Sequence, residues 1–262
     1  MTIFDDDVRT TRLAADRFQS RISERFNVGP IPNGGYVMSL ALKAMLENFP
    51  GREPLTTTMH YLRPSQNGEV TIEVETVKEG KRYATAMGKL VQGGKETARV
   101  IATFGSHDDE PGAARHVSGA PPTLVPLEQA VTIPPNDFFV IGRQLDIRFE
   151  PGTAAFMEGK RSDQAIIAGY IRFVDGRDAD VLALTLLCDA LPPPSANVIP
   201  FGWTPTLELT THVRARPKPG WLRFKFESRF VFGGLLEEDG ELWDESDTLV
   251  AQSRQLAQVP NR

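Results

Sequence analysis

The feature that most constrains this chain is a short phrase that it contains twice. "TTTMHYLRP" spans residues 56–64, and "LTTHVRARP" spans residues 209–217. Both contain Thr, one further residue and His, followed by an apolar stretch and an Arg-Pro pair. The copies lie about a domain length apart, far more than the period of a solenoid repeat. The phrase therefore predicts that one structural unit occurs twice in the chain.

A helix is expected before each copy of the phrase. Residues 36–49 place apolar side chains at helical spacing, and a Pro-Gly pair ends this pattern. Residues 178–194 begin with Asp178 and Asp180, either of which is a suitable N-cap, and end in three prolines. The body of this second segment is apolar nearly all round, so we expect the helix to be deeply buried.

Strand patterns follow each helix. The expected strands of the first half lie at residues 71–77, 82–92 and 96–105, and those of the second half lie at residues 206–216, 221–232, 240–245 and 248–259. Asp239 and Gly240 predict a hairpin turn between two of these strands. Helix and strands thus recur in the same order in both halves.

A single apolar helix with several antiparallel strands can bury its surface only if the sheet wraps around it. Two such units side by side join their sheets and cover each other's edges. We therefore predict an α+β fold of two tandem units, each an antiparallel sheet wrapped round a central helix. The N-terminal unit is expected at residues 1–107, a linker rich in Pro, Gly and Ala at residues 108–136, and the C-terminal unit at residues 137–262.

Composition and charge exclude several classes of protein. A net charge of −5 gives no basic footprint for nucleic acid. The acidic N-terminus does not resemble a signal peptide, and no run of 18 apolar residues is present to span a membrane. Cys188 is the only cysteine among 262 residues, so we expect no disulfide, no cysteine metal site and a cytoplasmic location.

Five segments carry a resemblance to a known family: "PNGGYVMSLALKA", "HYLRP", "LCDALPPP", "ELTTHVRARP" and "TLVAQSRQL". In this order they resemble the acyl-CoA thioesterase II family and its thioesterase-like relatives, which have a double hotdog fold. The likeness covers almost the whole chain except the linker. It rests on the order of the motifs, since no single one is very specific. It implies hydrolysis of an acyl-CoA thioester without a metal or cofactor.

The resemblance also implies which residues hold the attacking water. Members of the family use an Asp at the end of the second helix, a Thr or Ser on the following strand and a Gln on the last strand. These positions fall on Asp189, Thr210 and Gln255 of this sequence. An alignment through the Arg-Pro pair instead places an apolar residue at the threonine position, and Thr211 is then the nearest hydroxyl.

Asp189 is unusual for reasons that do not depend on the family. A carboxylate at the C-terminal end of a helix meets the negative end of the helix dipole, and burial raises its pKa further. Such a group can take a proton from water as a general base. The alternative is that Asp189 points into solvent where the helix frays. Residue type alone selects neither Thr210, which fits any strand, nor Gln255, one of three glutamines in its segment.

Gly34, Gly35 and Tyr36 stand at the start of the first helix and are our candidates for binding substrate. Free backbone N–H groups at a helix start can stabilise the charge that develops on a thioester oxygen, and glycine lets a ligand approach closely. The alternative is that the glycines permit a tight turn and close helix packing.

His60 and His212 occupy matching positions in the two copies of the phrase, and we expect them to be strand-packing residues rather than catalytic ones. No histidine pair has the spacing of a metal site. The two Arg-Pro segments, with Lys218 and Arg223, form a modest basic cluster. This cluster either meets the phosphates of CoA or is a solvated strand end.

We therefore expect an acyl-CoA thioesterase that hydrolyses its substrate by water activation and forms a homodimer or larger homo-oligomer. Two other hypotheses remain. A hotdog hydratase or dehydratase acting on acyl thioesters typically needs a catalytic His together with an acid on the helix, and no His lies near Asp189 in the sequence. A non-catalytic acyl-CoA-binding protein would hold palmitoyl-CoA and release no thiol.

Overall fold

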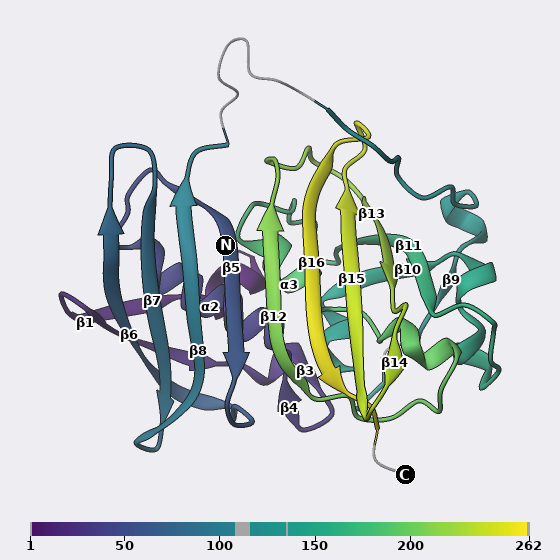
Figure 1. Ribbon diagram of the computed structural model, residues 1–262, viewed down its shortest axis with the longest axis horizontal. Helices are drawn as coiled ribbons and strands as arrows, with labels where there is room; N and C mark the ends of the chain where they lie inside the picture. The colour runs from purple at the N-terminus through teal and green to yellow at the C-terminus, as the bar shows by residue number, and fades with distance from the viewer. Residues whose placement is uncertain (1, 108–115, 135, 261–262) are drawn as a thin grey trace.

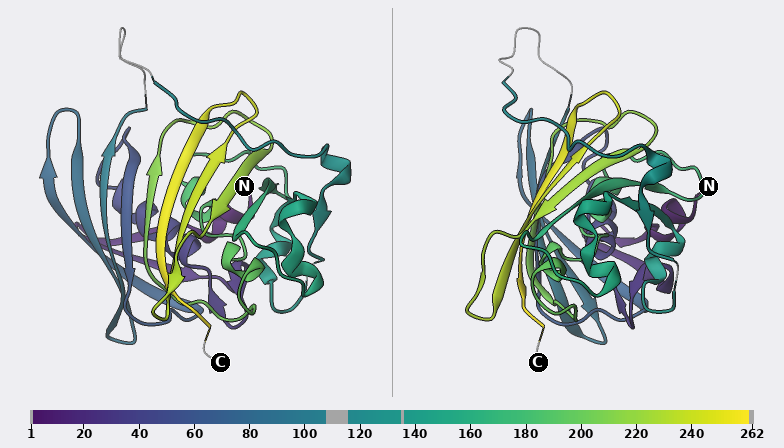
Figure 2. Two further views of the ribbon diagram at one scale, coloured as in Figure 1. Left: turned by 45° about the vertical axis from the view of Figure 1, so that its right-hand side comes forward. Right: turned by 90° about the vertical axis from the view of Figure 1, so that its right-hand side faces the viewer.

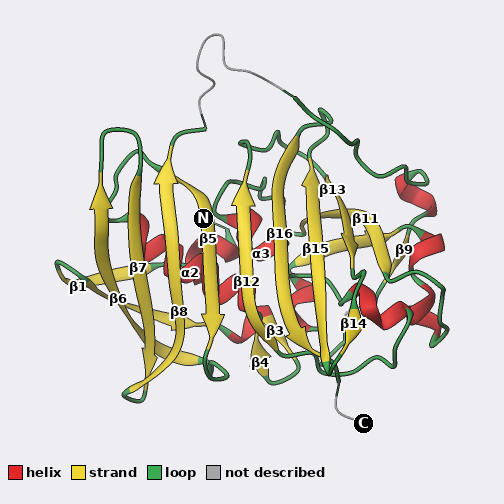
Figure 3. Ribbon diagram, in the orientation of Figure 1, coloured by secondary structure: helices red, strands yellow, loops and turns green. Residues whose placement is uncertain are grey.

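The computed structural model describes residues 2–107, 116–134 and 136–260. One large antiparallel sheet runs across the molecule, with strand order β1-β2-β6-β7-β8-β5-β12-β16-β15-β13-β11-β10-β9 and β14 paired to β15 (Figures 1 and 3). The helices lie on one face of this sheet, and the outermost strands curve back around them (Figure 2). Strands β5 and β12 pair at the centre, where the two halves of the chain meet.

The α-helices of the described residues are short except for α2. They are α1 (Ile3–Asp7), α2 (Gly34–Leu46) and α3 (Ala183–Leu187), and the 3₁₀ segments are η1 (Glu24–Phe26), η2 (Leu127–Gln129), η3 (Val140–Arg143), η4 (Pro151–Thr153), η5 (Ala155–Glu158) and η6 (Pro194–Asn197). The strands of the first half are β1 (Thr10–Ala14), β2 (Arg17–Ile22), β3 (Asn27–Val28), β4 (Ile31–Pro32), β5 (Glu53–Tyr61), β6 (Gly68–Glu79), β7 (Ala84–Gln92) and β8 (Lys95–Gly105). The strands that follow are β9 (Val131–Thr132), β10 (Leu145–Phe149), β11 (Ile166–Phe173), β12 (Thr206–Val213), β13 (Leu222–Glu227), β14 (Val231–Phe232), β15 (Leu235–Trp243) and β16 (Leu249–Gln258).

Helix α2 forms the centre of the N-terminal half. The Asn33 side chain accepts a hydrogen bond from the Tyr36 N–H at 2.9 Å and so caps the first turn. The predicted apolar face is fully buried, with Val37, Leu40 and Ala41 packed into one core with the inward residues of the sheet. The sheet therefore wraps the helix, as the sequence pattern predicts.

The two halves have the same strand order when it is read outward from their junction. One side runs β5-β8-β7-β6-β2-β1, and the other runs β12-β16-β15-β13-β11-β10. At the junction Thr58 lies opposite Thr210, with the two hydroxyl oxygens 2.8 Å apart. Where the helices meet, the hydroxyls of Ser39 and Thr185 are 2.6 Å apart. An approximate twofold axis through both pairs thus relates the halves, and this accounts for the repeated phrase.

His60 and His212 each lie two residues beyond one of the paired threonines, so they are equivalent positions. Both side chains are exposed. The expectation that they are packing residues is wrong, because strand alternation places them on the outer face of the sheet with Thr58 and Thr210.

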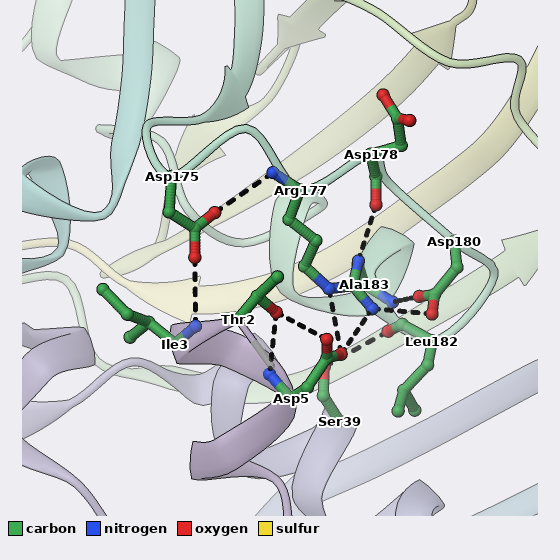
Figure 4. A network of polar contacts seen from close by, with 10 residues as sticks. All are labelled: Thr2, Ile3, Asp5, Ser39, Asp175, Arg177, Asp178, Asp180, Leu182 and Ala183. Atoms are coloured by element: carbon green, nitrogen blue, oxygen red, sulfur yellow. Dashed lines mark hydrogen bonds and ion pairs between the residues drawn. The ribbon is translucent and has the colours of Figure 1, made fainter.

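The second helix is much shorter than its sequence predicts. Helix α3 has five residues against thirteen in α2. Arg177 holds the preceding segment in place, since its guanidinium donates to Asp5 at 3.0 Å and to Asp180 at 2.7 Å (Figure 4). Asp180 in turn accepts from the Ala183 N–H at 2.8 Å, as an N-cap would. Helix α3 ends at Leu187, before the three prolines, and residues 190–205 contain only the short η6 segment.

The hairpin expected at Asp239 and Gly240 does not exist, because both residues lie inside β15. A Cβ on Gly240 would stand 2.3 Å from the Phe226 ring, so the glycine admits a core aromatic side chain from the neighbouring strand. The turn lies instead at Gly233 and Gly234, which have positive φ values of 62° and 79° and join β14 to β15.

Part of the predicted linker, residues 108–115 and 135, lies outside the described residues. Its described part includes β9, which pairs with β10 at the edge of the sheet. The domain boundaries proposed from the sequence stay predictions. Along the described chain, no helix combines the length and hydropathy needed to cross a membrane.

Candidate active site

A pocket of about 540 Å³ opens beside the point where α3 ends. Most of its wall is apolar and comes from segments far apart in the chain. Its apolar lining includes Val28, Ile31, Leu62, Ile133, Phe138, Phe139, Phe156, Met157, Leu191, Phe201, Trp203 and Leu207. Polar residues line the pocket as well, and Asn33, Tyr61, Asp189, Thr206 and Gln255 are among them. Such a combination is typical of a small-molecule site.

Asp189 is half-buried and faces this pocket. Its Oδ2 accepts a hydrogen bond from the Gly35 N–H at 2.7 Å and another from Asn33 Nδ2 at 3.0 Å. The second proton of Asn33 Nδ2 goes to the backbone carbonyl of Asp189 at 2.7 Å. Both side-chain hydrogen bonds fall on Oδ2 and neither falls on Oδ1. One carboxylate oxygen is therefore fixed, and the other is free to meet a water or ligand.

The unfavourable dipole of α3 at Asp189 is opposed by the favourable dipole at the start of α2. The N–H groups at the first turn of α2 point at the carboxylate and stabilise its charge. Burial is nevertheless the largest influence and raises the pKa of Asp189 to about 6, against the opposing hydrogen bonds from Gly35, Asn33 and Gly34. The carboxylate is thus a base whose pKa lies near neutrality, and the solvent-exposed alternative is wrong.

Gln255 is buried on β16 and links two further groups to the site. The Thr206 hydroxyl donates to Gln255 Oε1 at 2.9 Å. With Oε1 accepting, the amide nitrogen is the atom that hydrogen-bonds to Glu238, which lies directly opposite on β15. Burial and then the Asp189 charge raise the pKa of Glu238 well above its usual value. Burial thus favours the protonated form of Glu238, whose side chain holds the Gln255 amide beside Asp189.

The structure does not bring Thr210 to the site. Its hydroxyl lies on the outer face of the sheet, where it contacts Thr58 at 2.8 Å and donates to Glu208 at 2.5 Å. Thr211 faces inward but lies deeper, with its hydroxyl 3.9 Å from the Met38 sulfur. The threonines that line the pocket are Thr204 and Thr206, and Thr206 lies at a β-bulge between Thr206 and Glu208. The extra residue of this bulge shifts the inward face, and strand alternation alone does not reveal it.

The helix-start residues have structural roles that differ from the expected one. A Cβ on Gly35 would lie 2.6 Å from the Thr185 carbonyl oxygen and 2.7 Å from Asp189 Cβ, so this glycine allows α2 and α3 to approach. Its N–H is already bonded to Asp189 and is not free for an oxyanion. Gly34 does line the pocket. Tyr36 does not, because it is fully buried, with its hydroxyl bonded to the Asp7 carbonyl and the Ser23 N–H.

Sequence reasoning missed four residues of the site: Asn33, Tyr61, Thr206 and Glu238. Asn33 stands in the quoted "PNGGY" motif at the N-cap position, which was a usable signal. Glu238 was also detectable, since it alternates with Leu236 and Leu242 on the buried face of β15. Tyr61 and Thr206 carry no comparable signal.

The basic cluster is divided between two ends of the sheet. Arg63 lines the pocket, whereas Arg216 bonds to Glu53 at 2.7 Å and Arg223 pairs with Asp247 at 2.6 Å, both away from it. Cys188 is buried, and burial raises the pKa of its thiol to about 12, so it stays protonated. In the parts of the chain that the structure describes, no cluster of three or more His, Cys, Asp or Glu side chains is placed to hold a metal ion.

Comparison with known proteins gives consistent matches over nearly the whole chain. Residues 22–105 match the model of the acyl-CoA thioesterase N-terminal domain, and residues 121–259 match that of the C-terminal domain. An uncharacterized protein of Mycobacterium tuberculosis strain H37Rv is 27% identical over 93% of this chain and 91% of its own.

Solved structures agree in fold. A candidate thioesterase II from Thermobifida fusca superposes with a TM-score of 0.91 at 29% identity, covering 100% of this chain and 98% of the other. A hot dog fold protein from Alicyclobacillus acidocaldarius superposes with a TM-score of 0.88 at 20% identity, covering 100% of this chain and 99% of the other. These findings confirm the predicted double hotdog architecture.

Proposed function

The chain belongs to the acyl-CoA thioesterase family and is a thioester hydrolase; from this premise we propose that it cleaves acyl-CoA with a water molecule held by Asp189, Thr206 and Gln255. The observation that carries the proposal is Asp189 itself. Its carboxylate has a pKa of about 6, has one oxygen fixed by the first turn of α2, and lines the pocket. A base of this kind is suited to activating water at neutral pH.

Water and these side chains are sufficient for the hydrolysis. Asp189 Oδ1 takes a proton as the water oxygen attacks the thioester carbonyl carbon. The resulting tetrahedral intermediate collapses with cleavage of the carbon–sulfur bond. The proton on Asp189 then passes to the leaving CoA thiolate, so the products are a carboxylic acid and CoA. Thr206 and Gln255 supply a hydroxyl and an amide next to the carboxylate, and these orient the water.

The pocket supports the substrate class. Its aromatic and aliphatic wall fits an apolar acyl group, whose burial there favours binding by about 25 cal/mol per Å² of apolar surface. Arg63 is a basic residue in the lining and is our candidate for contact with the CoA phosphates.

A thiol-release assay tests this function most simply. The purified chain is mixed with saturated acyl-CoAs from acetyl to palmitoyl, and free CoA is followed with a thiol reagent. We expect turnover of at least one substrate and a loss of turnover in Asp189→Asn. Binding of palmitoyl-CoA without thiol release from any substrate would reject hydrolysis and favour the acyl-CoA-binding hypothesis.

We also propose that the chain assembles into a homodimer or larger, because the outer face of the sheet exposes apolar side chains such as Ile101 and Leu256. Light scattering that gives about 29.0 kDa, the mass of one chain, across a wide concentration range would refute this.

A further inference from the structure

The proposed hydrolysis also needs a residue that stabilises the carbonyl oxygen of the thioester. As water attacks, negative charge develops on the carbonyl oxygen of the thioester, and a hydrogen-bond donor must stabilise it. The backbone amides at the start of α2 were the expected donors. The Gly35 N–H is bonded to Asp189 at 2.7 Å, and the Gly34 N–H also stabilises that carboxylate. Both amides stabilise the Asp189 carboxylate, so the oxyanion needs another hydrogen-bond donor.

The Tyr61 hydroxyl is a donor that fits this need. Its hydroxyl is buried, and no hydrogen-bonding partner is present for it among the described residues. A buried hydroxyl without a partner costs about 1–3 kcal/mol, so its persistence calls for a reason. The tyrosine lines the pocket at the C-terminal end of β5.

The hydroxyl stands close to the base. A Cβ on Gly34 would lie 2.9 Å from the Tyr61 hydroxyl oxygen and 3.0 Å from Asp189 Oδ2, so these two atoms flank the same small volume. The absence of a side chain on Gly34 leaves that volume open. A thioester whose carbonyl carbon faces a water on Asp189 would place its oxygen within reach of such a neighbouring donor.

We propose that the Tyr61 hydroxyl donates a hydrogen bond to the thioester carbonyl oxygen and stabilises its developing charge, an inference that rests on the proposed hydrolysis. The protonation state agrees with this role. Burial, followed by the charges of Asp189 and Glu208, raises the pKa of Tyr61 well above its usual value, so the hydroxyl keeps its proton over the neutral range. It is a donor and not a second base.

Tyr61→Phe removes only the hydroxyl. We expect kcat to fall on the order of 10²-fold, with little change in KM, since the bond strengthens as charge develops on the oxygen. Because the hydroxyl has no partner among the described residues, the melting temperature should stay the same or rise. Tyr170→Phe is the matched control, since its hydroxyl donates to the Val125 carbonyl at 2.9 Å. That variant should lose stability and keep its kcat.

Two non-hydrolysable ligands isolate the carbonyl contact. In the ketone analogue of an acyl-CoA, a methylene replaces the sulfur and the carbonyl remains, whereas the alkyl-CoA thioether lacks the carbonyl. Tyr61→Phe should weaken binding of the ketone about tenfold and leave the thioether unaffected. Equal affinity of both proteins for the ketone, or an unchanged kcat while the wild type hydrolyses acyl-CoA, would overturn the role of Tyr61. A wild type that hydrolyses no acyl-CoA would reject the proposed function, and the inference with it.

Discussion

The two halves of the molecule have the same strand order but differ where their helices end. The N-terminal half has a thirteen-residue helix buried in its sheet, whereas the C-terminal helix stops after five residues. In place of further helix, residues 190–205 form an irregular segment that supplies pocket walls such as Leu191, Phe201 and Trp203. The copy with the shorter helix thus contributes much of the pocket wall.

The register shows what the other copy has at the corresponding positions. Counting from the paired Thr58 and Thr210, Gln255 corresponds to Ala102, and Glu238 corresponds to Ala86. Counting from Ser39 and Thr185, Asp189 lies four residues on and so corresponds to Lys43. The symmetry-related position therefore lacks the acid and the amide, and one site is expected per chain.

The N-terminal copy contributes a different set. Asn33 and Gly35 hold the Asp189 carboxylate, and Tyr61 stands beside it where the C-terminal copy has Val213. Each copy lacks the groups that the other supplies, so neither half alone contains a complete site. Substitutions at paired positions can therefore test the comparison directly.

The largest expected effect comes from Asp189→Asn. Asparagine preserves shape but takes no proton, so kcat should fall on the order of 10²–10⁴-fold. Above pH 6 the melting temperature should be equal or higher, because the variant avoids ionising a half-buried carboxylate. Lys43→Asn, at the corresponding position of the other copy, should leave kcat unchanged. Full activity in Asp189→Asn would end the proposed mechanism.

Gln255→Ala should act mainly on kcat, since the amide orients the water and not the substrate. The substitution removes one contact that orients the water, and it also leaves Glu238 without the Gln255 amide. We expect the activation free energy to rise by about 1–3 kcal/mol, which lowers kcat about 5- to 150-fold. Gln252→Ala on the same strand but on its other face serves as the control. Steady-state kinetics of both variants would contradict the account if they lost activity equally.

Gly35→Ala should disturb the contact between α2 and α3. The added methyl would meet the Thr185 carbonyl oxygen and Asp189 Cβ, so we expect a loss of about 1–3 kcal/mol in the free energy of unfolding, measured by urea denaturation. Gly152→Ala, where no atom lies within 4 Å, should cost far less. A fully stable Gly35→Ala would mean that the helices do not need this contact.

Thr206→Val and Thr210→Val distinguish the two candidate threonines, and we expect the smallest effect here. Loss of the Thr206 hydroxyl should reduce kcat about 3- to 10-fold, the equivalent of one ordinary hydrogen bond. Thr210→Val should leave kcat unchanged, because that hydroxyl faces away from the pocket. A larger fall in kcat for Thr210→Val than for Thr206→Val would instead place Thr210 in the site.

The sequence was informative wherever a pattern repeats. The duplicated phrase, the helix starting near Tyr36 and the alternating strands predict the fold, and the resemblance places Asp189 and Gln255 in one pocket. Thr210 was selected by the motif although it faces outward, and Thr206 was missed because a β-bulge there breaks the alternation. Tyr61 was missed because a hydroxyl without a partner is visible only once the surrounding atoms are in place.

The pH dependence of stability follows from the same carboxylate. The folded pKa of Asp189, about 6, lies above the usual value near 4. Folding therefore favours its protonated form, and this contribution to stability is present below about pH 4 and is lost as the pH rises to about 6. Activity has the opposite requirement, since only the ionised carboxylate accepts a proton from water.

The most direct test of the central claim is the pH profile of kcat/KM for the wild-type protein between pH 4.5 and pH 8. The account predicts a tenfold fall per pH unit below a break near pH 6, and a plateau immediately above it. A profile that stays flat through pH 6, or that breaks only near pH 4, would contradict the assignment of Asp189 as a base held between the two halves.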